Sequence, residues 1–114
     1  MEGCIFCKIA RGEVPAQPVY EDSQVLAFRD VNPAAPVHVL IIPKEHIPGV
    51  LSITEENVGI VARMWEVIPK LAGELSVAEL GFRVVVNSGE GAGQSVPHLH
   101  FHLLAGRPLT WPPG

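Results

Sequence analysis

Residues 98–104 read His98-Leu99-His100-Phe101-His102-Leu103-Leu104, which places three of the chain's five histidines at alternate positions. Side chains of a strand alternate between its two faces, so a strand over residues 96–104 presents these three imidazoles on one face and apolar side chains on the other. A solvent-exposed polar face is the simplest interpretation, but such faces usually carry Lys, Glu or Thr, which are absent here. Two chemistries use several imidazoles on one face: a metal site, or an anion site in which histidine acts as nucleophile or acid–base.

A glycine-rich loop precedes this strand and favours an anion. Residues 88–95 read SGEGAGQS, and their backbone N–H groups are able to turn towards a phosphate. An ordinary flexible hairpin turn also explains the glycines. No Lys or Arg occurs between Arg83 and Arg107. Imidazole, hydroxyl, amide and backbone donors would therefore hold the anion, which suits a single phosphate group better than a polyphosphate.

The remaining sequence predicts an alternation of short strands and two helices. The predicted elements are a short helix over residues 4–10 that Gly12 and Pro15 terminate, a hairpin of residues 18–20 and 25–29, a strand over 37–43 buried on both faces, and a strand over 82–87. A longer helix follows a capping box at Ser52–Glu55 and carries apolar residues at helical spacing, with Pro69 expected to kink it or end it early. This order predicts an α+β fold with a largely antiparallel five-stranded sheet, one long helix and a short N-terminal helix.

Length and composition restrict the class of protein further. A chain of 114 residues supports one domain, residues 1–114, and 47% hydrophobic against 18% charged residues indicates a folded chain. The net charge of −4 argues against non-specific binding to nucleic acid or to an anionic membrane. No apolar run is long enough to span a membrane, and the start Met1-Glu2-Gly3-Cys4 has no signal or transit character. We therefore expect a soluble cytoplasmic protein.

The pattern histidine–apolar–histidine–apolar–histidine–apolar–apolar over residues 98–104 resembles the motif of the histidine triad (HIT) superfamily of nucleotide hydrolases and transferases. The resemblance extends from Ile5-Phe6 to the tail Trp111-Pro112-Pro113-Gly114. The tail and Gly106-Arg107 resemble the histidine triad nucleotide-binding (Hint) branch, whose members are nucleoside phosphoramidases. A HIT-like fold and hydrolysis at the α-phosphate of a nucleotide are what this resemblance implies.

The resemblance also implies roles for individual residues. His100 matches the nucleophile that forms a nucleotidyl-histidine, His102 matches the residue that contacts the phosphate oxygens and helps protonate the leaving group, and His38 matches the histidine that orients the nucleophile's far nitrogen. Without the motif, a satisfied core histidine is the preferred interpretation of His38. The positions that match the phosphate pocket are Asn87, Gly93, Gln94 and Ser95.

The nucleoside part of the site follows from the same resemblance. Asp30 matches the carboxylate that accepts both ribose hydroxyls, although a turn residue before Asn32-Pro33 is an equal alternative. The apolar slot around a purine base matches Ile5, Phe6, Ile9 and Phe28, which are also ordinary core residues. Family members are homodimers, and Trp111 is expected to reach the partner's leaving-group side.

Cys4 and Cys7 form a CxxC pair with three possible uses. A thioredoxin-like redox motif requires a strand before the helix, and only three residues precede Cys4. Buried reduced cysteines are a second interpretation. The third is structural zinc, because related HIT proteins bind zinc through ligands that correspond here to Cys4, Cys7, His46 and His98. No organic cofactor is expected.

The sequence leaves several functions open. A nucleoside phosphoramidase is favoured, a dinucleoside polyphosphate hydrolase and a non-catalytic purine nucleotide-binding module are alternatives, and a protein in which the histidine row itself binds a transition metal is a fourth. The last gives no role to Asp30 or to the glycine-rich loop. A pure binding module does not need the nucleophile at His100.

Overall fold

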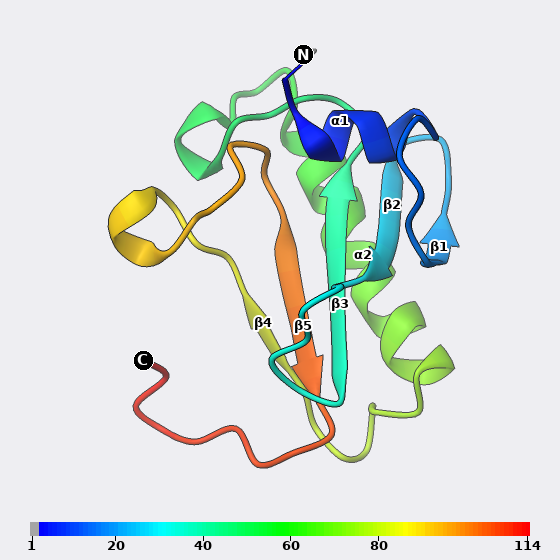
Figure 1. The fold of residues 1–114 in the computed structure, drawn as a ribbon, viewed down its shortest axis with the longest axis vertical. Helices are drawn as coiled ribbons and strands as arrows, with labels where there is room; N and C mark the ends of the chain where they lie inside the picture. The colour runs from blue at the N-terminus through cyan, green and yellow to red at the C-terminus, as the bar shows by residue number, and fades with distance from the viewer. Residues whose placement is uncertain (1–2) are drawn as a thin grey trace.

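The computed structural model describes residues 3–114 (Figure 1). Met1 and Glu2, part of the segment assessed above for targeting signals, lie outside the described residues. The elements are, in chain order, α1 (Ile5–Ala10), β1 (Pro18–Glu21), β2 (Val25–Arg29), β3 (Val37–Pro43), the 3-10 turn η1 (Val50–Ser52), α2 (Val58–Glu74), β4 (Arg83–Val85), the 3-10 turn η2 (Glu90–Ala92) and β5 (Phe101–Ala105). The predicted α+β class, with one long and one short helix, is confirmed. None of the helices within residues 3–114 is long and apolar enough to cross a membrane.

The five strands form one antiparallel sheet in the order β1-β2-β3-β5-β4. In Figure 1, α2 lies behind this sheet and α1 crosses the upper part of its front. The central strand β3 pairs with β2 and β5, and residues 38–43 of it are buried. Because both faces of the sheet are covered at this strand, its nearly continuous apolar sequence is explained.

Alternate strand residues supply two separate cores. Val25, Ala27, Val39 and Ile41 pack towards α2, together with Leu99, Phe101 and Leu103. Leu26, Phe28, Leu40 and Ile42 pack towards α1 in a smaller cluster with Phe6. The histidines that alternate with Leu99, Phe101 and Leu103 therefore belong to the α1 face, as the sequence pattern predicts.

The long helix differs from its prediction at both ends. It starts at Val58, with Asn57 as the residue before its first turn. The predicted capping box at Ser52–Glu55 is therefore wrong. Ser52 ends the turn η1, and its carbonyl accepts a hydrogen bond from Asn57 Nδ2, while Asn57 Oδ1 accepts one from Thr54 N. The side chain of Asn57 thus orders the loop before the helix.

The helix continues through Pro69 to Glu74 instead of ending early. Pro69 lacks the N–H that would bond the carbonyl of Trp65. Trp65 is half-exposed, and Val67 and Leu71 on the other face are held in the core. Core packing on that face therefore outweighs the lost hydrogen bond.

Two strands are shorter than predicted. β4 covers Arg83–Val85 rather than residues 82–87, and β5 starts at Phe101 rather than at residue 96. Pro97 has no N–H, His98 N bonds back to the carbonyl of Val96, and Leu99 N bonds Ile47 O. These hydrogen bonds replace a sheet ladder, so His98 and His100 precede the strand although their side chains keep its alternation.

Candidate functional site

The three histidines of residues 98–102 are divided between two sites. His100 and His102 line a groove of about 270 Å³ between α1, β2 and the loop after η2. His98 is fully buried and faces Cys4 and Cys7 instead. The ring of Phe6 separates the two sites, since it packs edge-on against both His98 and His100, with centroid distances of 5.9 and 5.1 Å.

The groove brings together most of the residues that the sequence predicts for it. Its predicted members are Ile5, Phe6, Ile9, Phe28, Asp30, Ser95, His100 and His102. Phe6 and Phe28 pack edge to face at 5.7 Å and form one apolar wall. The apolar part of the groove is therefore continuous with the core below it, and the imidazoles and the carboxylate of Asp30 are its polar groups.

The ring of His100 is fixed in one tautomer by the main chain. Its Nδ1 atom lies 2.7 Å from the carbonyl oxygen of His98, and a carbonyl oxygen only accepts, so Nδ1 carries the proton and donates it. The lone pair of a neutral ring then lies on Nε2. Since His100 lines the groove, this lone pair is not used by the hydrogen bond that fixes the ring.

His38 and His102 form a second fixed pair. Ala34 N donates to His38 Nδ1 over 3.0 Å, which places the proton of a neutral His38 on Nε2. That nitrogen lies 2.9 Å from His102 Nδ1 and donates to it, so neutral His102 carries its proton on Nε2. His102 is thereby set as a hydrogen-bond donor at its outer nitrogen.

This arrangement corrects the predicted partner of His38. His38 does not contact the far nitrogen of His100, because that nitrogen is bonded to the His98 carbonyl. Instead, His38 orients His102. A main-chain acceptor leaves no signature in a sequence, so only the structure identifies it.

The environment keeps the pair neutral. Burial is the largest cause that lowers the pKa of His102, to about 4, and the neighbouring His100 and His38 lower it further while Asp30 raises it. Burial also lowers the pKa of His38, against the opposing effect of the Asp30 carboxylate. At neutral pH both rings therefore carry one proton each.

Asp30 lies at the rim of the groove and serves both as a turn residue and as a polar group of the site. Its Oδ1 accepts a hydrogen bond of 2.8 Å from Asn32 N, which is the turn expected before Asn32-Pro33. Its Oδ2 lies 3.5 Å from His38 Nε2, and the side chain is 20% exposed. This carboxylate is therefore accessible to a ligand from the groove.

Five predicted site residues are not among those that line the groove: His38, which lies behind His102, and Asn87, Gly93, Gln94 and Trp111. Gln94 Oε1 accepts from Gly89 N, and its Nε2 donates to the carbonyls of Pro48 and Val96, so this amide braces the glycine-rich loop. Gly93 ends η2 at φ 92°, a conformation that favours glycine. Trp111 is 80% exposed, in the C-terminal segment that runs below the sheet in Figure 1.

Cys4, Cys7, His46 and His98 form a compact cluster beside α1. Their ligand atoms all lie within 4.8 Å of one another, and the sulfur–nitrogen distances are 3.3 Å from Cys4 Sγ to His98 Nδ1 and 3.2 Å from Cys7 Sγ to His46 Nδ1. Ligands on a common tetrahedral zinc lie roughly 3.3–3.8 Å apart, given metal bonds of about 2.0–2.3 Å. The donor set therefore has the size and chemistry of a metal site.

The protonation of His98 suits such a site. Its Nε2 donates to the carbonyl of Pro43 over 2.8 Å, which leaves the lone pair on Nδ1, the atom that faces the two sulfurs. Burial lowers the pKa of His98 to about 4, so the ring is neutral at pH 7. Burial and the neighbouring Cys4 raise the pKa of Cys7, and a bound cation would reverse that effect.

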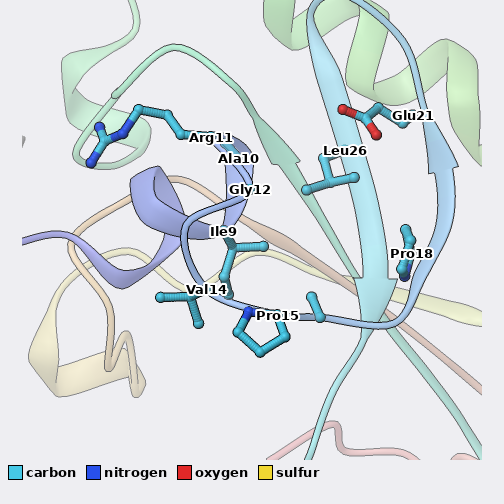
Figure 2. A pocket seen from close by; sticks show the side chains of 10 residues that line it. Ile9, Ala10, Arg11, Gly12, Val14, Pro15, Pro18, Glu21 and Leu26 are labelled. Carbon is cyan, nitrogen blue, oxygen red and sulfur yellow. The ribbon is translucent and has the colours of Figure 1, made fainter.

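The groove also contains residues that the sequence does not single out: Pro15, Ala16, Arg29, Val31, Leu40 and Val96. Arg29 and Val31 flank Asp30, and that adjacency is the only sequence signal for them. A separate hollow of about 310 Å³ lies on the other side of Pro15 and Ala16, between the end of α1 and β1 (Figure 2). Its lining includes Ile9, Val14 and Leu26, and none of the five histidines belongs to it.

Comparison with known proteins gives consistent matches over nearly the whole chain. The family model described as HIT domain matches residues 11–109. An uncharacterized HIT-like protein of Synechococcus elongatus is 49% identical over 113 residues, 99% of this chain and 98% of the relative. A protein of Escherichia coli K12 named purine nucleoside phosphoramidase is 46% identical over 108 residues, 95% of this chain and 91% of the relative.

Solved structures agree with these sequence matches. The crystal structure of a HIT family hydrolase from Legionella pneumophila has a TM-score of 0.95 and 48% identity, covering 98% of this chain and all of that one. A histidine triad protein from Clostridium difficile has a TM-score of 0.93 and 48% identity, with 96% of each chain covered.

Proposed function

The chain belongs to the HIT domain family, and we propose that it is a nucleotide-binding hydrolase that cleaves nucleoside phosphoramidates or related nucleotidyl conjugates at the α-phosphate. The product is a nucleoside monophosphate, and the reaction passes through a nucleotidyl-histidine. The observation that carries this proposal is the hydrogen bond from His100 Nδ1 to the His98 carbonyl, which leaves the lone pair of His100 Nε2 in a groove beside an apolar slot. A pure binding site does not require that tautomer.

In the first step, His100 Nε2 attacks the α-phosphorus and a new N–P bond forms while the bond to the leaving group breaks. The leaving nitrogen is protonated in the bound substrate and departs as a neutral amine, while the Nε2–H of His102, oriented by the hydrogen bond between His102 Nδ1 and His38, donates a hydrogen bond to the leaving group. In the second step, water attacks the same phosphorus, the bond to His100 breaks, and the proton that the water loses passes to the released amine. Atoms and charge balance over the two steps.

The nucleoside would occupy the other half of the groove. Ile5, Phe6, Ile9 and Phe28 offer an apolar slot for a base, and Asp30 offers a carboxylate to the ribose hydroxyls. Ser95 lies on the same groove and would donate its hydroxyl to the phosphate. A purine is favoured because the Escherichia coli relative is named for purine nucleosides.

We also propose that the cluster of Cys4, Cys7, His46 and His98 holds a structural zinc. Two thiolates and two imidazoles complete a closed tetrahedral site, and such sites cross-link the chain rather than activate water. Here the cross-link would join α1, the loop after β3 and the segment that precedes β5. Phe6 lies on α1, and His100 lies on the segment that precedes β5.

A homodimer is the proposed assembly, with one HIT domain in each chain. Trp111 is 80% exposed, which is the accessibility a residue needs if it contacts a partner. Light scattering tests this proposal, and a monomer at micromolar concentration would contradict it.

The decisive experiment for the reaction is a rapid-quench measurement. The protein is mixed with adenosine 5′-phosphoramidate and quenched in denaturant within milliseconds. The mass of the intact protein is then measured by mass spectrometry. We expect a mass increase of one adenylyl group in the wild type, a slower increase in His102→Gln, and none in His100→Ala. Turnover retained by His100→Ala would refute the mechanism, and rapid cleavage of diadenosine polyphosphates with little phosphoramidate cleavage would favour the alternative hydrolase.

A further inference from the structure

The loop between β2 and β3 carries two groups that the candidate site depends on. Asp30 lies at the groove rim, and Ala34 N donates to His38 Nδ1 over 3.0 Å. In Figure 1 this loop lies at the lower end of the sheet, beside the end of β5. Within the described residues, every hydrogen bond of residues 31–36 goes to a side chain, that of Asp30, His38 or Arg107. The hydrogen bonding of this loop therefore depends on those three side chains.

Arg107 reaches the loop from the segment that follows β5. Val37 pairs with Ala105 at the end of the sheet, so the chain leaves β5 beside the start of β3. Arg107 Nε and Nη2 donate to the carbonyl of Ala34 over 3.1 and 3.0 Å, and Nη1 donates to the carbonyl of Pro108 over 3.0 Å. The guanidinium therefore ties Ala34 to the segment after the strand.

Gly106 brings the two segments close enough for these hydrogen bonds. Its φ is 95°, a conformation that favours glycine, and a Cβ at this position would lie 2.9 Å from Cβ of Pro36. The main chain after β5 thus packs directly against the loop and blocks its movement towards the end of the strand. Arg107 opposes movement in the other direction, because such a movement would lengthen both hydrogen bonds to the Ala34 carbonyl.

The N–H of Ala34 sets the direction of the hydrogen bond between His38 and His102. With this donor in place, His38 donates from Nε2 to His102 Nδ1, so His102 carries its own proton on Nε2. Without it, a neutral His38 is able to carry its proton on Nδ1 and to accept from His102, which then has its lone pair on Nε2. Asp30 Oδ2, 3.5 Å from His38 Nε2, still favours the first arrangement, so loss of the Ala34 donor has a partial effect.

We propose that Arg107 is a positioning residue for nucleotidyl transfer. By holding the carbonyl of Ala34 it keeps the N–H of the same residue on His38, and His102 remains a donor to the leaving group. The inference rests on the proposed function, because cleavage at the α-phosphate is what gives His102 a leaving group. Nucleotide binding should depend on Arg107 much less, since Asp30 is held separately by the hydrogen bond from its N–H to the His38 carbonyl.

Two measurements on the full chain test this role. Steady-state kinetics with adenosine 5′-phosphoramidate gives kcat and KM, and nitrogen-15 NMR of histidine-labelled protein shows which ring nitrogens of His38 and His102 are protonated. The variants are Arg107→Met, which keeps an unbranched side chain without a donor, and Arg107→Lys, which keeps a donor. Arg11→Met is the matched control, because Arg11 is also exposed but donates to the carboxylate of Glu13.

We expect Arg107→Met to lower kcat about three- to tenfold, the size of one exposed charge-assisted hydrogen bond, and to change KM less than about twofold. The nitrogen-15 shifts of His38 and His102 should move towards those of the opposite tautomers in this variant. Arg107→Lys should retain the wild-type tautomers and most of the wild-type kcat, because an ammonium group also donates to a carbonyl. Arg11→Met should match the wild type in both measurements.

An Arg107→Met variant with unchanged kcat would overturn the inference, and so would a fall in kcat that leaves both tautomers unchanged. An equal fall in Arg11→Met would also overturn it, because the loss of a positive charge alone would then explain the effect. A wild type that does not turn over the phosphoramidate would instead contradict the proposed function. The NMR measurement needs no turnover, so the two failures are distinguishable.

Discussion

The Nδ1 atom of His100 lies 2.7 Å from the main-chain carbonyl oxygen of His98, whose own ring is buried beside Cys4 and Cys7. One residue thus serves two neighbouring sites, one through its main chain and the other through its side chain. The three histidines that look alike in the sequence have different surroundings for this reason.

Replacement of His100 by alanine tests its proposed role as the nucleophile. We expect kcat for adenosine 5′-phosphoramidate to fall by about a thousandfold or more, since removal of a covalent nucleophile has effects of this order. The affinity for AMP should change by only about threefold, because Phe28 and Asp30 remain in place and Phe6 loses only one of its ring contacts. Steady-state kinetics and calorimetry measure the two quantities.

The control for this variant is His38→Gln, which removes the hydrogen-bond partner of His102 but leaves the proposed nucleophile His100 in place. It should lower kcat less than His100→Ala and should still form the adenylyl adduct. Equal loss in both variants, with no adduct in either, would indicate a general disturbance of the groove.

Much of the site follows from sequence because its signals are local. Alternation over residues 98–102 places the imidazoles on one face, and the structure confirms that face. The division of the row between two sites, with His98 beside Cys4 and Cys7, is predicted by the family resemblance and not by the alternation, since it depends on His46 and on α1 approaching from elsewhere in the chain. Gln94 has a role that its sequence position does not predict: the position matches a phosphate pocket, and in the structure the amide braces the glycine-rich loop.

Element boundaries depend on contacts that are distant in sequence. Leu99 N bonds Ile47 O, and this hydrogen bond keeps residues 96–100 out of the strand despite their alternating pattern. Local rules predict that Pro69 kinks the helix or ends it early; the apolar face around it is anchored in the core, and the helix does not end there but continues to Glu74. Tertiary packing decides both cases.

Asp22 stabilises the fold by joining the β1–β2 turn to α2. Partial burial alone would raise its pKa, but hydrogen bonds from Gln24 N, Tyr20, Val25 N and Arg63 outweigh that effect and hold the pKa well below its usual range. Asp22→Ala removes the acceptor of four donors, so we expect the free energy of unfolding to fall by about 2–3 kcal/mol. Urea denaturation at pH 7 measures the change.

Glu66→Gln is the matched control for this cluster. Glu66 lies 3.7 Å from the same Arg63 but is 67% exposed, so its loss should change stability by less than about 0.5 kcal/mol. Equal effects of the two variants would show that Asp22 acts only as a surface charge.

Metal analysis tests the cluster beside α1. Freshly purified protein should contain about one zinc per chain, and chelation should lower the melting temperature, because the four ligands come from three separate segments. Cys7→Ser should lose most of the metal, while His38→Gln, a histidine outside the cluster, should retain it. Well under one zinc per chain in the wild type would contradict a structural metal site.

His102 gives stability a defined dependence on pH. Its pKa in the folded chain is about 4, below the value of about 6.5 expected for an unfolded histidine. Between these values the unfolded chain binds more protons, so the contribution is complete above pH 6.5 and is lost as the pH falls towards 4. From pH 7.5 to 5 we expect the wild type to lose about 1 kcal/mol more than His102→Gln, after allowance for partial exposure. Urea denaturation of both proteins at several pH values measures the difference, and parallel curves would show that His102 does not titrate in this window.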